Sequence, residues 1–538
     1  MHFRFKESLH SVSERLQLLY LRKMRTYFTF FILIFCPLIF ADDSLPTTPK
    51  IKTLFSALNP TSLSQNFAFY ELYPETREGR LALKRAWRLL KKEENASDIA
   101  LPKVDIQPLI EMINREDSSS TELKEEELSF IESLGKNLQN RKLKGFNTWD
   151  KNFALEMNID EIDLCRSLFL AQYEDDPQLK TKVRTYEASI DLMALQILAE
   201  LSDTASNLDK IHAINQFIFH EMGFRFPPQS LWAKDIDVYT FLPSVIDSRK
   251  GVCLGVSILY LCLAQRLNLP LEAITPPGHI YVRYVLENEE HLNIETTARG
   301  IHVPSEMYMG LETKKLQTRN IKEVIGLAFM NQASVSWAKN NHPQAIELYE
   351  KALLYLPDDD LVQTFLAYNY LFENKNEKGI ALLKEKNKKT AKYSITADTI
   401  TEDFLQGKTD AEGIKAIFMQ VDETRDSILE KQQTLQKVTQ KHPHFRAALL
   451  QLAGTYLQLG REKEALPILE KYHKLDAQDP IVNYYLAVIC YGRYDYKRAW
   501  HFFKIAQDEV HKKDHDPRTL KELHKALMRT CPDPLSSS

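Results

Sequence analysis

The chain has 538 residues, of which 44% are hydrophobic and 26% are charged, and its formal net charge is -4. A chain of this length exceeds what one hydrophobic core supports, so we expect about three domains. The near-neutral charge, without a basic stripe, argues against nucleic acid as a partner.

The N-terminal segment has the pattern of a secretory signal. Three basic residues within 22–25 precede the apolar run 27–40, and Ala41 comes before a polar segment. The run is shorter than the roughly 18 apolar residues of a membrane-spanning helix. We therefore expect residues 1–41 to be a signal peptide, translation to start at Met24, and the protein to be exported to the periplasm or cell envelope. The alternative is an uncleaved N-terminal anchor, which would be the protein's contact with a membrane.

Helical periodicity dominates the part that follows. Apolar residues recur every three or four positions over 80–92, which predicts an amphipathic helix. The same spacing continues over 179–201 and 208–222, and Gly223 ends the pattern. We expect residues 45–158 to form a helical N-terminal region.

The next segment changes from helix to strand. Gly251 precedes the apolar stretch 252–267, which predicts a helix buried on nearly all sides. β-Branched and aromatic residues over 271–275, 280–286 and 291–296 predict three strands, the last two joined as a hairpin.

The cysteines do not form a metal or disulfide pattern. One of the 6 cysteines falls in the signal, and the others are scattered without a CxxC pair: Cys165, Cys253, Cys262, Cys490 and Cys531. An HExxH motif is also absent. We therefore expect neither a disulfide framework nor a metal ion, and no cofactor.

Cys253 is the candidate nucleophile. It lies in the first turn of the predicted helix, where the helix amides and the neighbouring Arg249 and Lys250 favour a thiolate. His279 follows a proline turn and is the candidate base. Taken alone, a cysteine of this kind is most often a small buried residue, and we assign that role to Cys262 on the same helix.

Glu295 is the candidate residue that orients the base. It lies 16 residues after His279, an even separation that places both on one face of the hairpin. They would be directly opposite in a hairpin turning about Glu287, or diagonal after a register slip of two residues. Asn293 shares this face and is the alternative orienting residue. The backbone amide of Cys253 is the expected oxyanion donor.

The C-terminal part repeats with the 34-residue period of tetratricopeptide units. Small and large apolar residues recur in two pairs: Ala333, Ser336, Ala345 and Tyr349 match Ala367, Tyr370, Gly379 and Leu383, while Ala453, Tyr456, Ala465, Leu469 and Tyr472 match Ala487, Cys490, Ala499, Phe503 and Ala506. We expect repeats at 321–392 and 445–515, a helical connector or degenerate repeat at 393–444, and a tail at 516–538. Such an array offers a surface for a protein or peptide partner.

The central motifs resemble the transglutaminase-like superfamily, and within it the SirB-type branch. The resemblance rests on 218–224 (IFHEMGF), 240–255 (TFLPSVIDSRKGVCLG), 277–279 (PGH) and Arg283, in the family's order. It implies a papain-like α+β core, which we place at 159–318. The expected fold is therefore an α+β papain/transglutaminase-like core with a helical N-terminal extension and an all-α tetratricopeptide repeat solenoid.

Two departures from the family's pattern bear on function. Many members of that branch have proline where this chain has Cys253, and they are regarded as inactive. The family's aspartate is Glu295 here, followed by Thr296-Thr297 in place of Pro-Phe. The resemblance thus implies a cysteine-dependent amide hydrolase or acyltransferase acting on a peptide or protein. The alternative is a non-catalytic scaffold that binds partners through its repeats, and the retained triad of residue types favours the enzyme.

Overall fold

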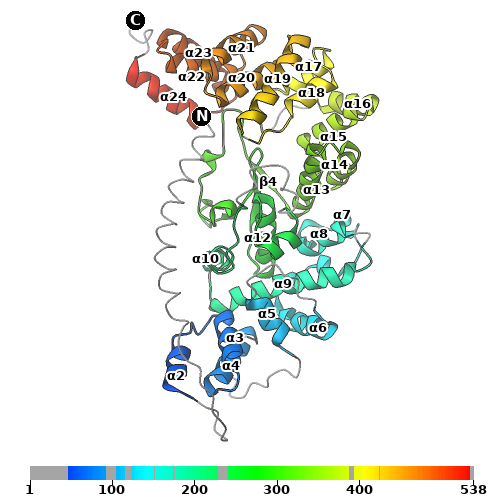
Figure 1. Ribbon diagram of the computed structural model, residues 1–538, viewed down its shortest axis with the longest axis vertical. Coiled ribbons are helices and arrows are strands. Elements are labelled where there is room, and N and C mark those ends of the chain that lie inside the picture. Colours follow the sequence, from blue (N-terminus) through cyan, green and yellow to red (C-terminus); the bar gives the residue numbers. More distant parts are fainter. Residues whose placement is uncertain are drawn as a thin grey trace.

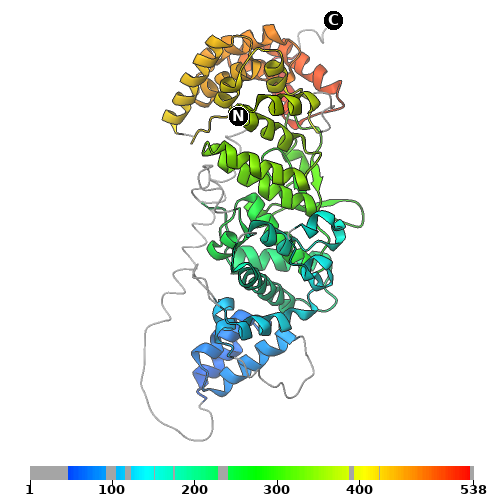
Figure 2. The same cartoon turned by 90° about the vertical axis from the view of Figure 1, so that its right-hand side faces the viewer.

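The chain is arranged in three tiers. N-terminal helices lie at one end, a helical core with a small sheet lies in the middle, and a curved array of helices lies at the other end (Figures 1 and 2). The predicted signal at 1–41 lies outside the described residues, and among those that are described no helix is both long and apolar enough to cross a bilayer. The computed structural model describes residues 47–91, 105–114, 123–150, 152–173, 176–227, 240–386, 393–422 and 424–532.

The N-terminal region is helical, as predicted. Its helices are α2 (Pro49–Ser56), α3 (Leu63–Leu72), α4 (Arg77–Lys91), α5 (Gln107–Asn114) and α6 (Glu125–Leu134). α4 is the predicted amphipathic helix, and the face that carries Leu83, Ala86 and Leu90 is buried. Trp87 on the same face stacks on Phe130 of α6, with 5.4 Å between the ring centroids. Burial of this apolar face is what holds α4 against its neighbours.

A second set of helices leads into the core. After the short turns η1 (Gly135–Asn137), η2 (Gln139–Lys142) and η3 (Lys144–Asn147) come α7 (Phe153–Glu156), η4 (Ile159–Glu161), α8 (Leu164–Gln172), α9 (Leu179–Glu200), α10 (Asn207–Asn215) and the π-helical turn η5 (Gln216–Glu221). Asp163 caps α8 by accepting a hydrogen bond of 2.9 Å from the Arg166 amide. Gly223, with φ of 67°, ends the helical stretch where the sequence predicts the stop.

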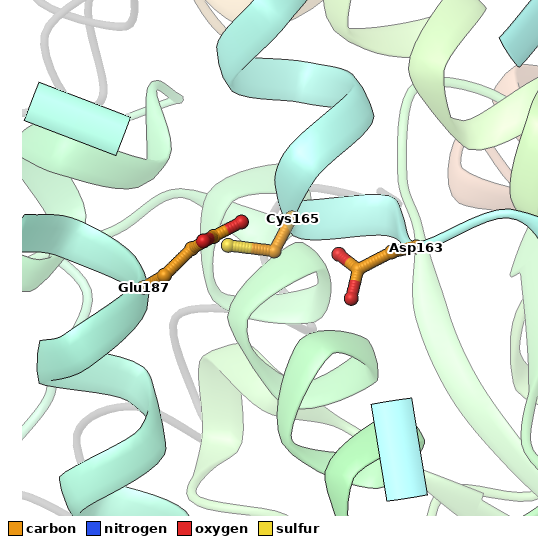
Figure 3. A group of neighbouring side chains, drawn as sticks. All are labelled: Asp163, Cys165 and Glu187. Atoms are coloured by element: carbon orange, nitrogen blue, oxygen red, sulfur yellow. The ribbon is translucent and has the colours of Figure 1, made fainter. Parts of the chain in front are cut away.

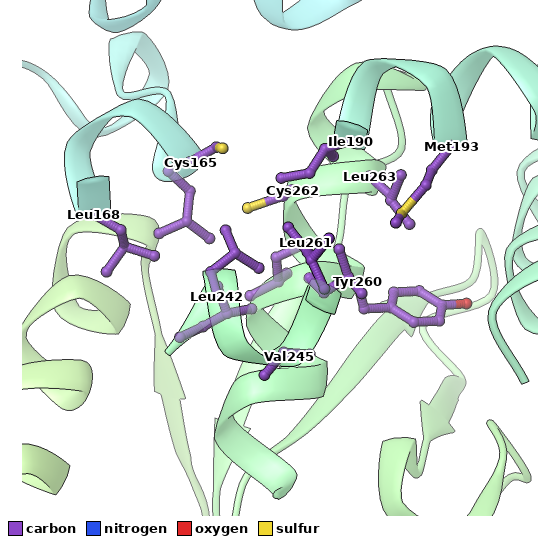
Figure 4. Packing of buried hydrophobic residues seen from close by; sticks show 14 of the residues in the cluster. Cys165, Leu168, Ile190, Met193, Leu242, Val245, Tyr260, Leu261, Cys262 and Leu263 are labelled. Carbon is purple, nitrogen blue, oxygen red and sulfur yellow. The ribbon is translucent and has the colours of Figure 1, made fainter. Parts of the chain in front are cut away.

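The central helix α12 (Cys253–Arg266) follows α11 (Leu242–Ser248) and matches the predicted buried helix. Figure 4 shows side chains of α8, α9 and α11 around the α12 residues 260–263. Leu259, Tyr260 and Leu263 are fully buried. An apolar surface on every side therefore places this helix at the centre of the core.

The sheet has four antiparallel strands in the order β3-β2-β1-β4. They are β1 (Glu272–Thr275), β2 (Tyr281–Val285), β3 (His291–Ile294) and β4 (Gln317–Arg319). The first three are the predicted strands. β4 was not predicted, because its three polar residues carry no alternating pattern. It pairs with β1, for example through Ile274 and Thr318, which are more than 40 residues apart in the chain.

The first repeats are formed by α13 (Ile321–Ala338), α14 (His342–Tyr355), α15 (Asp360–Phe372) and α16 (Asn376–Lys386). The small residues of the 34-residue pattern lie at the helix contacts. Ala333, Ala345 and Ala367 are fully buried, and a Cβ on Gly379 would lie 2.8 Å from Leu371. Small side chains at these positions allow the paired helices to approach closely.

The second part of the array extends further than the sequence predicts at both ends. It contains α17 (Thr399–Leu405), α18 (Ala411–Ile417), α19 (Arg425–Lys441), α20 (Arg446–Gln458), α21 (Glu462–Leu475), α22 (Pro480–Gly492), α23 (Tyr496–His511) and α24 (Arg518–Thr530). The predicted connector 393–444 is helical, and α19 packs on α20. The segment 516–538, predicted as a tail, contains α24, which buries Leu520, Leu523 and Leu527 against the array. Its apolar spacing fits a helix that covers the end of the solenoid.

The hydrophobic core does not follow the predicted domain boundaries. One continuous cluster of buried side chains runs from Leu63 in α3, through α12, to Tyr370 in α15. The N-terminal helices, the sheet and part of the first repeats therefore share one core, whereas the remaining repeat helices, including the second repeats (α17–α24), bury their side chains in other clusters. A periodicity along the chain cannot reveal this sharing, because it reports which face of an element is buried and not against what.

Candidate functional site

Cys253 is the first residue of α12, at the position that the sequence predicts. The preceding Val252 is the N-cap residue and has no polar side chain, so it makes no side-chain hydrogen bond to the first-turn amides. A Cβ on Gly251 would lie 2.5 Å from Val256 Cγ2 and 3.3 Å from Val245 Cγ1. A residue without a Cβ is therefore needed for the backbone at 251 to pack this closely against Val256.

His279 meets both other members of the predicted triad. It lies in the turn before β2, where its backbone N–H donates to the Pro276 carbonyl at 3.1 Å and Gly278 has φ of 68°. Its Nε2 lies 2.7 Å from Glu295 Oε2, and the Cys253 thiol lies close enough to help raise the pKa of the imidazole. With Nε2 engaged by the carboxylate, Nδ1 is the ring nitrogen left for the sulfur.

The electrostatics favour a charged pair between the imidazole and the carboxylate. Burial alone would lower the pKa of His279, but its hydrogen bonds and charge interactions with Cys253 and Glu295 outweigh burial and raise that pKa to about 9. Burial would raise the pKa of Glu295, but hydrogen bonds from His279, Thr297 and Tyr308 hold it below the usual value. The side chains are only 19% and 7% exposed, so solvent screens this pair weakly.

The hairpin register places His279 and Glu295 diagonally. Arg283 pairs with Asn293 and Val282 pairs with Ile294, which is two residues from the register that would set His279 directly opposite Glu295. This is the diagonal arrangement that the sequence left open. Glu295 follows the last residue of β3, and its amide donates to the Ile301 carbonyl at 3.0 Å. The longer glutamate side chain spans the diagonal.

Two residues that the sequence analysis did not assign also hold Glu295. The Thr297 amide and hydroxyl donate to Glu295 Oε1 at 3.1 and 2.6 Å. The Tyr308 hydroxyl donates to Oε2, the oxygen that also contacts His279. The signal for Thr297 was the Thr296-Thr297 departure from the family's Pro-Phe, since an acidic side chain can accept hydrogen bonds from a threonine two residues further on. Tyr308 lies in an aperiodic loop, and no sequence pattern points to it.

Asn293 does not orient His279. Its Oδ1 accepts a hydrogen bond of 2.9 Å from Arg283 Nε, and its Nδ2 donates to the Val303 carbonyl at 2.7 Å and to Ser305 Oγ at 3.1 Å. The alternative role proposed for Asn293 is therefore wrong. Asn293 instead anchors the loop after β3. Strand parity alone could not distinguish this role from that of orienting His279, because Asn293 and Glu295 lie on the same face.

Helix α12 is tied to the acid-bearing turn η6 (Thr296–Ala298) one helical turn beyond the cysteine. Ser257 Oγ and Thr296 Oγ1 lie 3.0 Å apart, and both side chains are buried. Because residue 257 is four positions after Cys253, this bond lies on the same face of α12 as the thiol. It links the helix of Cys253 directly to the turn that follows Glu295.

Arg249, one of the two cations that the sequence places near the thiol, contacts the backbone before the α11–α12 segment. Arg249 has φ of 52°, and its Nη1 donates to the Met222 carbonyl at 3.4 Å. The backbone around it pairs with Arg225, whose carbonyl accepts the Gly251 amide at 3.2 Å. These contacts attach the turn before α12 to the end of η5.

One cluster of potential metal ligands occurs among the described residues, away from Cys253. Asp163, Cys165 and Glu187 each offer an atom within 4.8 Å of the others, and all three are buried (Figure 3). Arg166 already binds both oxygens of Glu187 at 2.6 Å, and Asn140 donates to Asp163 at 3.0 Å. These carboxylates are thus used in an internal polar network, which explains the cluster without a metal ion.

The comparisons with known proteins agree with this architecture. Residues 184–322 match the model of the transglutaminase-like superfamily, and residues 432–499 match that of the tetratricopeptide repeat. The second match begins inside the segment predicted as a connector, in α19.

Curated relatives cover parts of the chain. UPF0162 protein PM0557 of Pasteurella multocida is 30% identical over 90 residues, 17% of this chain and 33% of that protein. UPF0162 protein PA3419 of Pseudomonas aeruginosa is 28% identical over 149 residues, 27% of this chain and 50% of that protein. The chain therefore spans half the length of these relatives or less.

Solved structures of repeat proteins are similar in part. A thermophilic TPR protein of Thermus thermophilus is 16% identical, with a TM-score of 0.21, covering 38% of this chain and 99% of that one. YrrB, titled a TPR protein with an unusual peptide-binding site, is 14% identical, with a TM-score of 0.19, covering 37% and 92%. The family matches and the observed helices and sheet establish that the chain combines a transglutaminase-like domain over residues 184–322 with C-terminal tetratricopeptide repeats.

Proposed function

We propose that the protein is an exported thiol enzyme that hydrolyses or transfers the acyl group of an amide in a peptide or protein. The single observation that supports this most is the hydrogen bond of His279 to Glu295, on an imidazole whose pKa Cys253 and Glu295 together raise. A nucleophile, a base and a group that orients the base are the parts that acyl transfer requires.

In this proposal the Cys253 thiolate attacks the amide carbonyl, and the oxyanion is held by the Cys253 backbone N–H at the start of α12. The His279 imidazolium gives its proton to the departing amine as the C–N bond breaks, which leaves a thioester. Water or an acceptor amine then attacks the thioester, and His279 takes the proton from that nucleophile. The thiolate leaves, and Glu295 holds the imidazole in one orientation throughout.

The repeats supply the interaction surface. Tetratricopeptide arrays bind protein or peptide partners, and this array forms the far tier of the molecule (Figure 2). We therefore propose that the partner or substrate protein is held by the array while the thiol acts. Export is part of the same proposal, and mass spectrometry of the mature N-terminus tests it: a start at residue 42 is expected, and a chain retaining 27–40 would contradict signal cleavage.

Selective alkylation of the free thiols tests the enzymatic proposal. Treated briefly with iodoacetamide at pH 6, Cys253 is expected to react roughly 10-fold faster than Cys531, because only the former has an imidazolium partner. Both thiols are half-buried, so Cys531 is a matched control, whereas Cys165 and Cys262 are buried. Adducts are mapped by peptide mass spectrometry.

Equal alkylation rates at Cys253 and Cys531 would contradict the enzymatic proposal and favour the alternative, a non-catalytic scaffold. In that case the transglutaminase-like domain would act as a support, and the repeats would carry the function. Partner recovery that is unchanged by Cys253→Ser, together with an unchanged phenotype, would favour the scaffold independently.

A further inference from the structure

The loop that carries Tyr308 contacts two parts of the molecule at once. It runs from the end of the acid-bearing turn to β4, over residues 299–316, and its regular structure is the short turn η7 (Ser305–Met307). Loops of this length without secondary structure are uncommon in compact domains and are often functional.

At its inner end the loop touches the site. The Tyr308 hydroxyl donates to Glu295 Oε2. The Tyr308 ring stacks on His279, with 5.7 Å between centroids and 20° between planes, and on Tyr281 at 4.8 Å and 22°. Burial and the nearby Glu295 raise the pKa of Tyr308, so its hydroxyl stays protonated as a donor. Tyr308 thus contacts both partners of the acid–base pair.

At its outer end the loop is held by the repeat array. The Gly310 carbonyl lies 3.0 Å from Nε2 of His515, which precedes α24, and Arg518 Nη1 lies 2.7 Å from Met307 Sδ. Leu311 packs against the hydrophobic cluster of the second repeats. The residue after it, Glu312, accepts a hydrogen bond of 2.9 Å from the Ile395 amide.

A second set of contacts joins the loop to the segment between the two repeat pairs. The Lys314 amide donates to the Tyr393 carbonyl at 2.9 Å, and Thr313 forms an isolated β-bridge with Ser394. Residues 307–314 are therefore held by segments that lie between 79 and 211 positions further along the chain. On the side of the core, the Ser305 hydroxyl three residues before Tyr308 accepts hydrogen bonds from the side chains of Arg283 and Asn293.

We infer that Tyr308 is a positioning residue for the His279–Glu295 pair, and that the second repeats, by holding the 299–316 loop, set the reactivity of Cys253. The inference rests on the proposed function. A partner that displaces the array's contacts with the loop would release the tyrosine from Glu295, and one that tightens them would hold it there. The array would then regulate the thiol as well as bind a partner.

Tyr308→Phe removes the hydroxyl and keeps the ring. We expect the alkylation rate of Cys253 at pH 6 to fall about 10-fold, because a loosened Glu295 no longer holds the imidazole in place. At pH 10, where base ionises the thiol without help, the rate should change less than about 2-fold. An equal fall at both pH values would indicate general damage to the fold and would overturn the positioning role.

His515→Ala tests whether the contact between the second repeats and the 299–316 loop affects Cys253. It should reproduce the pH 6 loss of Tyr308→Phe, while His515→Gln, whose amide can still donate to Gly310, should restore most of the rate. His444→Ala, at an exposed histidine of the same array, should leave the rate unchanged. The melting temperature of each variant is measured in parallel.

The outcomes separate this inference from the proposed function. If wild-type Cys253 reacts no faster than Cys531, the proposed function fails. If wild-type Cys253 is fast and neither Tyr308→Phe nor His515→Ala slows it at pH 6, the inference alone is overturned. A loss with Tyr308→Phe but none with His515→Ala supports the tyrosine's role and overturns control by the repeats.

Discussion

Replacing His279 with glutamine is expected to slow the alkylation of Cys253 about 100-fold at pH 6, because the variant lacks the imidazolium that pairs with the thiolate. With the pKa of His279 raised to about 9, the wild-type imidazole stays charged across the neutral range. The wild-type rate should therefore exceed the rate of the variant throughout pH 6 to pH 8. In the variant the rate should climb with pH, as for a thiol without a partner, and approach the wild-type rate near pH 10.

The measurement is the pseudo-first-order rate of iodoacetamide labelling at Cys253 across pH 5 to 10, read by peptide mass spectrometry. His220→Gln, at an exposed histidine of the same domain, serves as the matched control and should keep the wild-type profile. Superimposable profiles for the wild type and His279→Gln would refute a role for the imidazole in activating the thiol.

The same histidine makes folding stability depend on pH. Its pKa in the folded protein lies above the ordinary value of 6.5, so its contribution is complete below pH 6.5 and is lost as pH rises through about 9. The shift corresponds to about 3 kcal/mol at most. The stability difference between wild type and His279→Gln, followed by urea unfolding, should thus shrink between pH 6.5 and pH 9.5. A difference that grows with pH would contradict the charged pair.

Asp191→Ala is expected to destabilise the core by roughly 3–5 kcal/mol, the largest stability effect that we predict, because it leaves a buried guanidinium without its carboxylate. Asp191 on α9 accepts a hydrogen bond of 2.7 Å from Arg266 Nε on α12, and it also binds Arg141. The Arg266 side chain is fully buried, and its Nη1 donates to the Cys262 carbonyl at 3.2 Å.

The measurement is the urea midpoint of the transition that reports the core, for example by tryptophan fluorescence. Lys351→Ala removes an exposed pair with Glu347 and should cost no more than about 0.5 kcal/mol. Adding Arg266→Met to Asp191→Ala should recover part of the loss, because the unpaired charge is then gone. If Asp191→Ala costs no more than Lys351→Ala, water reaches the pair and the network does not stabilise the core.

The elements that the sequence predicts well are those with a local pattern. The buried helix α12 and the β2–β3 hairpin follow from runs of apolar, β-branched and aromatic residues, each of which depends on neighbours a few positions away. The repeats follow from a 34-residue spacing of small side chains such as Ala465 and Ala499, because helix pairs of one shape bury the same positions. The three residues of the candidate site are proposed in the same way, from helix start, turn and strand parity.

What the sequence does not predict depends on contacts between distant segments. The register that makes His279 and Glu295 diagonal, the pairing of β4 with β1, and the approach of Tyr308 to Glu295 are set by how loops close and pack. The core shared by the N-terminal helices and part of the first repeats has the same origin. Local periodicity therefore determined which elements form and which face each one buries. Only the tertiary structure decided what covers those faces, because a hydrophobic face is not selective for its partner and the choice depends on the shape of the whole chain.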